Sequence, residues 1–180
     1  LKSAGLDPDR DVALSYVGTS AEAVPLLLAG KADAAVLPEP AASAAEIKAK
    51  QTGISVVRAL DVTELYAAHS GRPAGIPQAG LAVTERFLDA HPDIVAALHA
   101  ASVAAADWVA DNPTAAAALI ADPLKLPVPI VEASLPRFRL KVASAREAKA
   151  DLEAYFNALM TLSPDIVAGH LPEAAFYWGG

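Results

Sequence analysis

The sequence predicts an α/β fold in which helices cover a parallel sheet. Between residues 11 and 60, short apolar runs alternate with segments of helical character. The connections between these segments are only a few residues long, and a glycine follows each helical segment. Two successive strand–helix–strand units with short connections imply parallel strands joined by right-handed crossovers.

The first part of the chain supplies these elements in alternation. Nearly continuous apolar runs are typical of strands that are buried on both faces, and three are predicted here: residues 11–17, 33–37 and 54–60. Two helices are predicted between and after them, at residues 21–29 and 41–51, ended by Gly30 and Gly53. Pro25 removes a backbone hydrogen bond inside the first helix, so that helix is expected to kink or to begin later than Thr19.

The middle of the chain is less regular. Residues 61–69 fit one or two helical turns, and residues 70–77 are rich in glycine and proline, which predicts a loop. A fourth strand is predicted over residues 78–84. Thr84 is then expected to cap a short helix that extends to Leu88.

From His91 onward the sequence is helical almost throughout. Small and apolar residues recur at spacings of three and four, which predicts the packed face of a long helix: Ile94, Leu98, Ala101, Ala105 and Trp108. Asn112-Pro113 is expected to end this helix and to start another, which stops near Ala121 before Asp122-Pro123.

Two more helices are predicted near the C-terminus. Pro127 and Pro129 bracket the start of a helix over residues 130–135. Ser144 and Glu147 have the Ser-x-x-Glu spacing of a capping box, which predicts a helix reaching about residue 162. The tail, residues 166–180, carries Phe176, Tyr177 and Trp178 and is expected to dock on the core rather than to form an exposed patch.

The first residues resemble the last turn of a helix. Leu1-Lys2-Ser3-Ala4 precedes Gly5, which stands where a glycine commonly ends a helix. We therefore expect the chain to begin inside a domain, as a processed or truncated product. The helices after residue 85 have one predicted strand to cover, so further strands are expected upstream of Leu1.

Composition argues against several classes of function. The net charge is −7 and the 14 basic residues are scattered, which argues against a nucleic-acid partner or an anionic membrane surface. Alanine supplies 43 of the 180 residues, so the hydrophobic fraction reflects helix packing, and no run reaches the roughly 18 apolar residues of a membrane span. The absence of cysteine removes disulfides and thiolate chemistry.

The sequence also lacks the usual catalytic and metal-binding signatures. Gly-x-Ser-x-Gly, Gly-x-Gly-x-x-Gly, a Walker-type loop and His-Glu-x-x-His are all missing. The four histidines, His69, His91, His99 and His170, share no metal-ligand spacing. We therefore expect a non-catalytic protein with no metal and no cofactor.

A candidate ligand site lies at the start of the first predicted helix. Gly18, Thr19 and Ser20 follow a predicted strand, at the carboxyl edge where α/β folds bind ligands. Backbone N–H groups, two hydroxyls and the positive end of the helix dipole favour a carboxylate, sulfonate, phosphate or nitrate group there. The alternative is a helix that is capped by Thr19 and Glu22 and binds nothing.

Three further positions belong to the candidate site. Pro38 and Pro40 hold Glu39 in a stiff turn after the neighbouring strand, where the carboxylate either accepts hydrogen bonds from a ligand or caps the helix at residue 41. Gln78 enters the fourth strand, where the chain is expected to cross between domains. Elsewhere, Arg137 and Arg139 flank Phe138 and are expected to contact an acidic surface or to bind an anion.

These segments resemble the solute-binding proteins of ABC importers, and more narrowly their nitrate/sulfonate/taurine and thiamine-precursor group. Residues 18–40, with Thr19-Ser20-Ala21-Glu22 and Pro38-Glu39-Pro40, carry the resemblance together with residues 76–83 and 84–93. It implies a type II periplasmic-binding-protein-like fold, with two lobes of parallel-type sheets flanked by helices. Residues 1–77 would then form most of the second lobe.

On the same resemblance, residues 78–180 would form the return strand and the helical C-terminal part of the first lobe, whose initial part is missing. Lobes of this kind close over a ligand by a hinge. Gly18, Thr19 and Ser20 would face the cleft, and Glu39 and Gln78 would lie on its rim or wall.

The resemblance implies a periplasmic or extracellular lipid-anchored component that captures a small anionic or heteroaromatic solute and delivers it to ABC permease subunits. No nucleic-acid partner is implied, and membrane contact would be limited to the permease or a lipid anchor. Two alternatives share the fold: the effector domain of a LysR-type transcription regulator, and a pyrimidine-synthase-like enzyme. The absence of cysteine argues against the enzyme, which uses a cysteine-rich motif.

Overall fold

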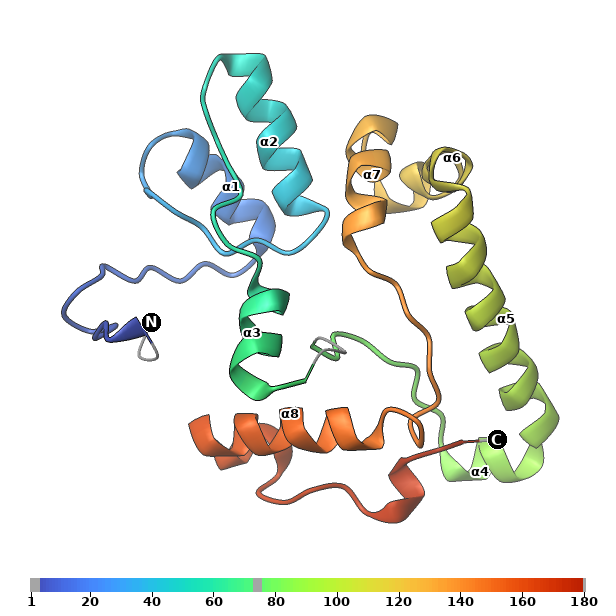
Figure 1. Ribbon diagram of the computed structural model, residues 1–180. Helices are drawn as coiled ribbons and strands as arrows, with labels where there is room; N and C mark the ends of the chain where they lie inside the picture. Colours follow the sequence, from blue (N-terminus) through green and yellow to red (C-terminus); the bar gives the residue numbers. More distant parts are fainter. Residues whose placement is uncertain (1–3, 73–75, 180) are drawn as a thin grey trace. The chain divides into compact units, whose positions relative to one another are not determined.

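The computed structural model describes residues 4–72 and 76–179, and the regular structure within them is helical (Figure 1). Predictions for residues 1–3, for residues 73–75 of the loop and for Gly180 lie outside the described residues. The α-helices are α1 (Ser20–Leu28), α2 (Ala41–Thr52), α3 (Val62–Ser70), α4 (Glu85–Ala90), α5 (Pro92–Asp111), α6 (Pro113–Leu124), α7 (Val128–Ser134) and α8 (Lys149–Leu162). Short 3-10 helices are η2 (Leu135–Arg137), η3 (Pro164–Val167) and η4 (Ala174–Phe176).

The chain forms two compact units, each made from two separate stretches of sequence. Unit 1 comprises Leu1–Val57 and Pro113–Phe138. Unit 2 comprises Arg58–Asn112 and Arg139–Gly180. The division into lobes at residue 77, which the family resemblance implies, stays a prediction.

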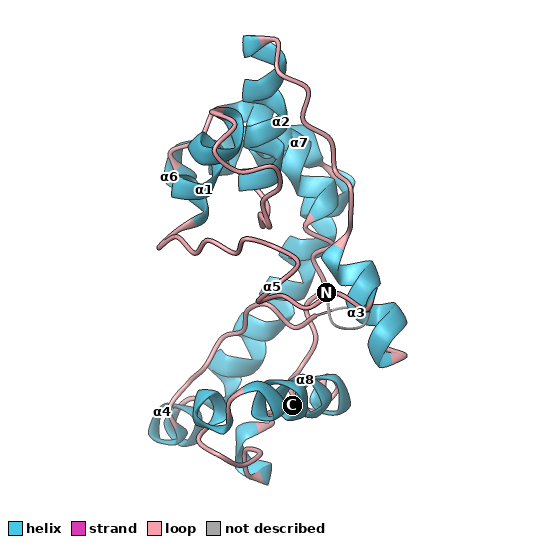
Figure 2. Ribbon diagram, turned by 90° about the vertical axis from the view of Figure 1, so that its left-hand side faces the viewer, coloured by secondary structure: helices cyan, strands magenta, loops and turns pink. Residues whose placement is uncertain are grey.

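The predicted parallel sheet is not confirmed, because residues 4–72 and 76–179 contain no β-strand (Figure 2). Residues 11–17, 33–37, 54–60 and 78–84 are turns or irregular backbone instead. A strand is stabilised by hydrogen bonds to a neighbouring strand, and an apolar run without that neighbour leaves its backbone groups to water. The large side chains of these runs are exposed accordingly, for example Tyr16 at 88% and Val36 at 83%.

Unit 1 has an apolar core made largely of alanine. Within it α1 packs on α2, α2 packs on α7, and α7 packs on α6. The buried apolar residues of these helices are Val24, Ala44, Ala45, Ala49, Ala116, Ala117, Ala121, Ile130 and Val131. A methyl side chain allows two helices to approach closely and loses no rotamer entropy on burial. The predicted use of alanine in close packing is confirmed here, with helices as the partners.

Unit 2 buries a different face of α5 from the predicted one. Ile94, Leu98 and Trp108 are 49%, 46% and 43% exposed, whereas Val95 is 7% exposed. The covered face contains Val95, His99, Ser102, Ala106 and Val109. Alanines occur on all sides of α5, so the periodicity of apolar residues is compatible with burial of more than one face. The covered face is the one that packs against α4 and against the Trp178 ring, which lies 5.4 Å from the His99 ring.

α5 is also long and apolar enough to cross a membrane, judged by length and composition alone. It has 20 residues, and a window of 18 of them has a mean hydropathy of 1.3. Core helices of soluble proteins meet the same criterion, so this property assigns no membrane location.

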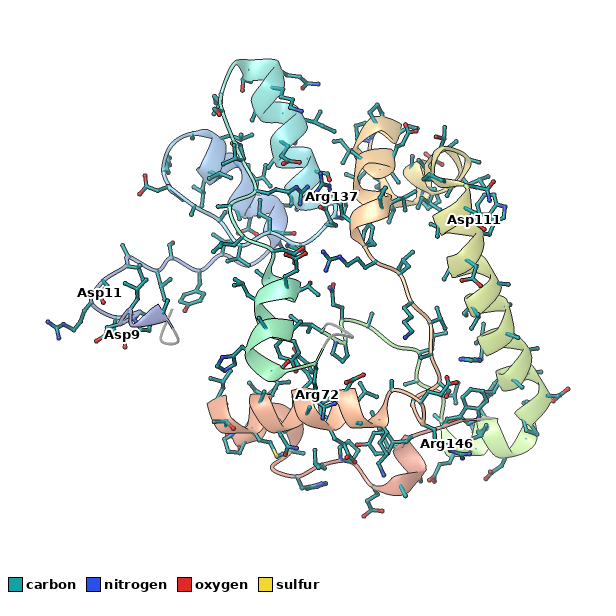
Figure 3. All side chains as sticks on the ribbon, viewed as in Figure 1. Asp9, Asp11, Arg72, Asp111, Arg137 and Arg146 are labelled. Carbon is teal, nitrogen blue, oxygen red and sulfur yellow. The ribbon has the colours of Figure 1, made fainter. Side chains whose placement is uncertain are left out.

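Ionic contacts connect neighbouring elements of unit 2. Asp61 caps α3 by accepting hydrogen bonds from the Thr63 N–H at 2.9 Å and the Glu64 N–H at 3.2 Å. Arg139 donates to the other Asp61 oxygen at 2.8 Å and to Glu64 at 3.2 Å. This confirms, for Arg139, the expectation that the Arg-Phe-Arg segment contacts an acidic surface. Arg72, labelled in Figure 3, pairs with Asp151 of α8 at 2.8 Å.

The ends of several helices differ from the predictions: α4 extends past Leu88 to Ala90, and α7 begins at Val128 rather than at residue 130. α6 does not stop at Ala121 but continues through Asp122-Pro123 to Leu124. A proline in the last turn is tolerated because its missing N–H removes only one backbone hydrogen bond, at an end where the last carbonyl groups have no helical partner in any case. Lys125, with φ of 53°, then ends the helix in the left-handed conformation. α8 begins at Lys149 rather than directly after Ser144, since residues 145–148 form turns.

The predicted hydrogen bonds between Ser144 and Glu147 are formed, but they close the turn at residues 145–148 rather than capping α8, whose N-cap Ala148 makes no side-chain hydrogen bond. The Ser144 N–H and hydroxyl both donate to Glu147 Oε2, at 2.9 and 3.0 Å, and the Glu147 N–H donates back to Ser144 Oγ at 3.2 Å. The tail is anchored beside this turn, because the Arg146 N–H donates to the Trp178 carbonyl at 2.9 Å. Tyr177 is 4% exposed, as the docking prediction requires, whereas Phe176 is 55% exposed.

Candidate functional site

Thr19 and Ser20 lie at the N-terminal end of α1, as predicted. Thr19 is the N-cap residue, with extended backbone angles of φ −144° and ψ 155°, and Ser20 is the first helical residue. Pro25 is accommodated inside α1 without shifting this start. The N-terminal end of a helix presents backbone N–H groups and a partial positive charge, which favour an anion at this position.

The hydrogen bonds at this helix start differ from the predicted capping box. The Thr19 hydroxyl donates to Glu22 Oε1 at 3.1 Å, and the Gly18 N–H donates to Glu22 Oε2 at 3.3 Å. The Thr19 side chain makes no capping hydrogen bond to a helix N–H. The Glu22 carboxylate therefore folds back over residues 18 and 19 and takes the donors that a bound anion would use.

Gly18 permits this arrangement through its lack of a side chain. A Cβ atom built at this position would lie 3.3 Å from Glu22 Oε1. That separation is tighter than an ordinary contact, so any other residue would press on the carboxylate. Gly18 and Thr19 are exposed and Ser20 is half-buried, which leaves this end of α1 accessible to solutes.

Glu39 has the structural role that was the alternative to ligand binding. Its Oε2 atom accepts a hydrogen bond from the Ser43 N–H at 3.2 Å, in the first turn of α2. The Pro38 carbonyl accepts from the Ala42 N–H at 3.0 Å, so both predicted residues organise the start of this helix. Glu39 is half-buried and Pro38 is exposed.

The predicted site residues fall into two groups. Gly18, Thr19, Ser20, Pro38 and Glu39 all belong to unit 1, in which α1 and α2 pack together and start at the same end of the pair (Figure 1). Gln78 belongs to unit 2, where it is exposed on an irregular segment. The structure thus unites five of the six residues in one unit.

A pocket in unit 2 was not anticipated from the sequence. It has a volume of about 460 Å³, and its lining includes Glu85 and Asp89 of α4 together with Arg146 and Trp178. None of the predicted site residues lines it. Glu85 and Asp89 are spaced four residues apart on one helix, which signals a shared face, but the sequence contains no signal that brings Arg146 and the tail to them.

Two groups near this pocket have shifted pKa values. Hydrogen bonds from the Ser144 N–H and hydroxyl lower the pKa of the Glu147 carboxyl below its usual 4.5. Burial raises the pKa of the Tyr177 phenol above its usual 10.0, and the nearby Glu153 carboxylate raises it further. Among residues 4–72 and 76–179, no cluster of three or more histidine or acidic side chains is arranged to hold a metal ion.

Comparison with known proteins places most of the chain in one family. A family model described as the NMT1-like family matches residues 1–124. The match contains all six predicted site residues and ends with the last residue of α6. This family has a periplasmic-binding-protein fold, and its members are usually periplasmic or extracellular binding proteins. Neither the curated proteins nor the solved structures yielded a match.

Proposed function

The chain belongs to the NMT1-like family, and on that premise we propose that it is the solute-binding component of an ABC importer. It captures a small anionic or heteroaromatic solute, of the nitrate, sulfonate, taurine or thiamine-precursor type, and delivers it to a membrane permease. The role involves no chemical step. The observation that carries the proposal is the family match over 124 of the 180 residues.

The start of α1 supports an anionic solute. The Gly18 N–H and the Thr19 hydroxyl already donate to a carboxylate, that of Glu22, so these donors have the geometry to bind oxygen anions. A solute carboxylate, sulfonate or nitrate would replace Glu22 at the same donors and would gain from the helix dipole. Ser20 adds a second hydroxyl at the same end of the helix.

Glu39 and Gln78 have supporting roles in this proposal. Glu39 holds the first turn of α2 through Ser43, and the family resemblance implies that it lies on the rim of the site. Gln78 contributes an exposed amide. The proposed location is periplasmic, or extracellular with a lipid anchor.

Isothermal titration calorimetry against nitrate, taurine, other sulfonates, small carboxylates and pyrimidines tests the proposal. We expect at least one of these solutes to bind and to raise the melting temperature of the chain, because a ligand that binds the native state stabilises it. An absence of heat and of any thermal shift across the whole panel would overturn the proposed solute class.

Three variants test whether α1 holds the solute. The double replacement Thr19→Ala with Ser20→Ala should weaken binding about tenfold or more, because hydrogen bonds to a charged group are lost. Glu22→Gln should strengthen the binding of anions, because it removes the competing charge. Thr84→Ala is the matched control, since Thr84 caps α4 by accepting from the Phe87 N–H at 3.2 Å. Unchanged affinity in the double variant would remove α1 from the site.

A further inference from the structure

The pocket of unit 2 is bordered by segments that are fixed to one another. α4 packs on α5, and the Trp178 ring lies 5.4 Å from the ring of His99, which is also on α5. The Arg146 N–H donates to the Trp178 carbonyl at 2.9 Å, which holds Arg146, labelled in Figure 3, beside the tail. The volume of about 460 Å³ falls within the range of about 300–1,000 Å³ that small-molecule sites occupy.

Three charged side chains of both signs line this pocket without pairing. Glu85 and Asp89 are four residues apart on α4, which places their carboxylates on one face of the helix. Arg146 brings a guanidinium to the same pocket from the turn at residues 145–148. All three residues are exposed, and within residues 4–72 and 76–179 none of them forms an ion pair or a side-chain hydrogen bond. Their charges are therefore available to a ligand.

The rest of the lining is aromatic and apolar. Trp178 and Leu88 are half-buried and Tyr177 is 4% exposed, so ring surface lies beside the charged groups. Ala174 and Ala175 contribute only methyl groups, which leaves room for a ligand. A tryptophan ring stabilises an aromatic group through stacked or edge-to-face contact.

The arrangement of charge favours a ligand that carries both an ammonium and a carboxylate. An ammonium has three donors and no acceptor, so it can bridge two carboxylates, and a carboxylate matches the planar guanidinium. An amine without a carboxylate would leave Arg146 unpaired. An anion without an amine would lie beside two acidic side chains and be repelled by them.

We propose that this pocket binds an α-amino acid with an aromatic side chain. The ammonium lies between Glu85 and Asp89, the carboxylate pairs with Arg146, and the aromatic side chain packs on Trp178. The site shares no residue with the start of α1 and does not rest on the proposed capture of an anionic solute.

Calorimetry of the full chain with four ligands tests which groups are recognised. Phenylalanine should bind, and three analogues that each lack one group should bind about tenfold more weakly or worse. Phenylalaninamide lacks the carboxylate, N-acetylphenylalanine lacks the ammonium, and alanine lacks the aromatic ring. In Trp108→Phe the one remaining tryptophan is Trp178, so a change of its emission on addition of phenylalanine reports from the pocket.

Two arginine variants separate recognition from folding. Arg146→Gln should weaken phenylalanine binding about tenfold or more and leave phenylalaninamide binding unchanged, because only the amino acid has a carboxylate to pair. Arg86→Gln is the matched control, since Arg86 is exposed on α4, carries the same charge and does not line the pocket. It should leave both affinities unchanged. Glu85→Gln with Asp89→Asn should weaken both ligands.

Several results would overturn the proposal. Failure of phenylalanine to bind would do so, as would equal affinities of the unmodified chain for phenylalanine and phenylalaninamide. Equal weakening by Arg146→Gln and Arg86→Gln would show a general effect of charge. Phenylalanine binding that neither Arg146→Gln nor the emission of Trp178 reports would place the amino acid elsewhere on the chain.

Discussion

Val131 is the position where a single truncation tests the alanine-rich core of unit 1. It is 1% exposed on α7, and α7 packs against both α2 and α6. Val131→Ala removes two methyl groups, worth about 0.8 kcal/mol each when they are withdrawn from water. The cavity they leave adds to the loss because helices that pack through alanine have few atoms with which to refill it. We expect Val131→Ala to lower the free energy of unfolding by about 2–3 kcal/mol.

Urea unfolding followed by circular dichroism at the helix band measures this loss. For a slope of about 1–3 kcal/mol per molar, typical of small domains, the midpoint should fall by about 0.7–3 M with the slope unchanged. Val128→Ala is the matched control on the same helix, since Val128 is 41% exposed. It should cost under about 1 kcal/mol because a half-exposed side chain loses less on truncation.

Tryptophan fluorescence locates the effect within the chain. Both tryptophans, Trp108 and Trp178, belong to unit 2, whereas Val131 belongs to unit 1. If the units unfold separately, Val131→Ala shifts the circular dichroism transition and leaves the fluorescence transition in place. A loss of stability below about 0.5 kcal/mol, or one equal to that of Val128→Ala, would refute the packing of α7 against α2 and α6.

Three further predictions concern unit 2. Ser144→Ala should raise the pKa of Glu147 toward 4.5, as measured by carbon-13 NMR titration, because the hydroxyl bond that lowers it is lost; an unchanged pKa would contradict this hydrogen bond. The stabilisation that Glu147 provides is present above pH 4.5 and disappears as the pH falls through its lowered folded-state pKa, which acid unfolding of the two proteins compares. The raised pKa of Tyr177 stabilises the folded chain below pH 10, and this contribution is lost as the pH rises through the folded-state pKa. In a spectrophotometric titration, Tyr177→Phe should remove one phenol that ionises above pH 10, and a titration curve unchanged above pH 10 would contradict this. Asp61→Ala should lower the free energy of unfolding by about 1 kcal/mol, and Asp61→Asn should lower it by less. Asparagine keeps the cap of α3 and loses only the exposed ion pair with Arg139. Equal losses of the two variants in thermal unfolding would assign the stabilisation to the ion pair instead of the cap.

Local signals located most of the helices. α2 begins at residue 41 and ends before Gly53, as the sequence predicts, and Thr84 caps α4. Glycine ends a helix through its own backbone conformation, with φ of 74° at Gly53, and a threonine cap acts within one turn. Interactions of this short range can be read from neighbouring residues. The hydrogen bonds between Ser144 and Glu147 were predictable for the same reason.

The candidate site was predictable in place and less so in detail. The position of Thr19 at the start of α1 follows from the helix pattern. The Thr19–Glu22 spacing also predicted an interaction, but the carboxylate pairs with the Gly18 N–H and the Thr19 hydroxyl in a geometry that the spacing leaves open. Spacing brings two side chains within reach, whereas their rotamers depend on the surrounding atoms.

The amino-acid order alone established where most of the helices lie, that alanine serves their packing, and which residues stand at the first turn of α1. It left open which apolar runs find strand partners and which face of α5 is covered. Pairing and burial depend on residues far away along the chain, and in the described residues the runs at 11–17 and 33–37 have no strand beside them. A helix with alanines on all sides presents two nearly equivalent apolar faces, so the contacts of α4 and Trp178 with α5 determine which face is covered.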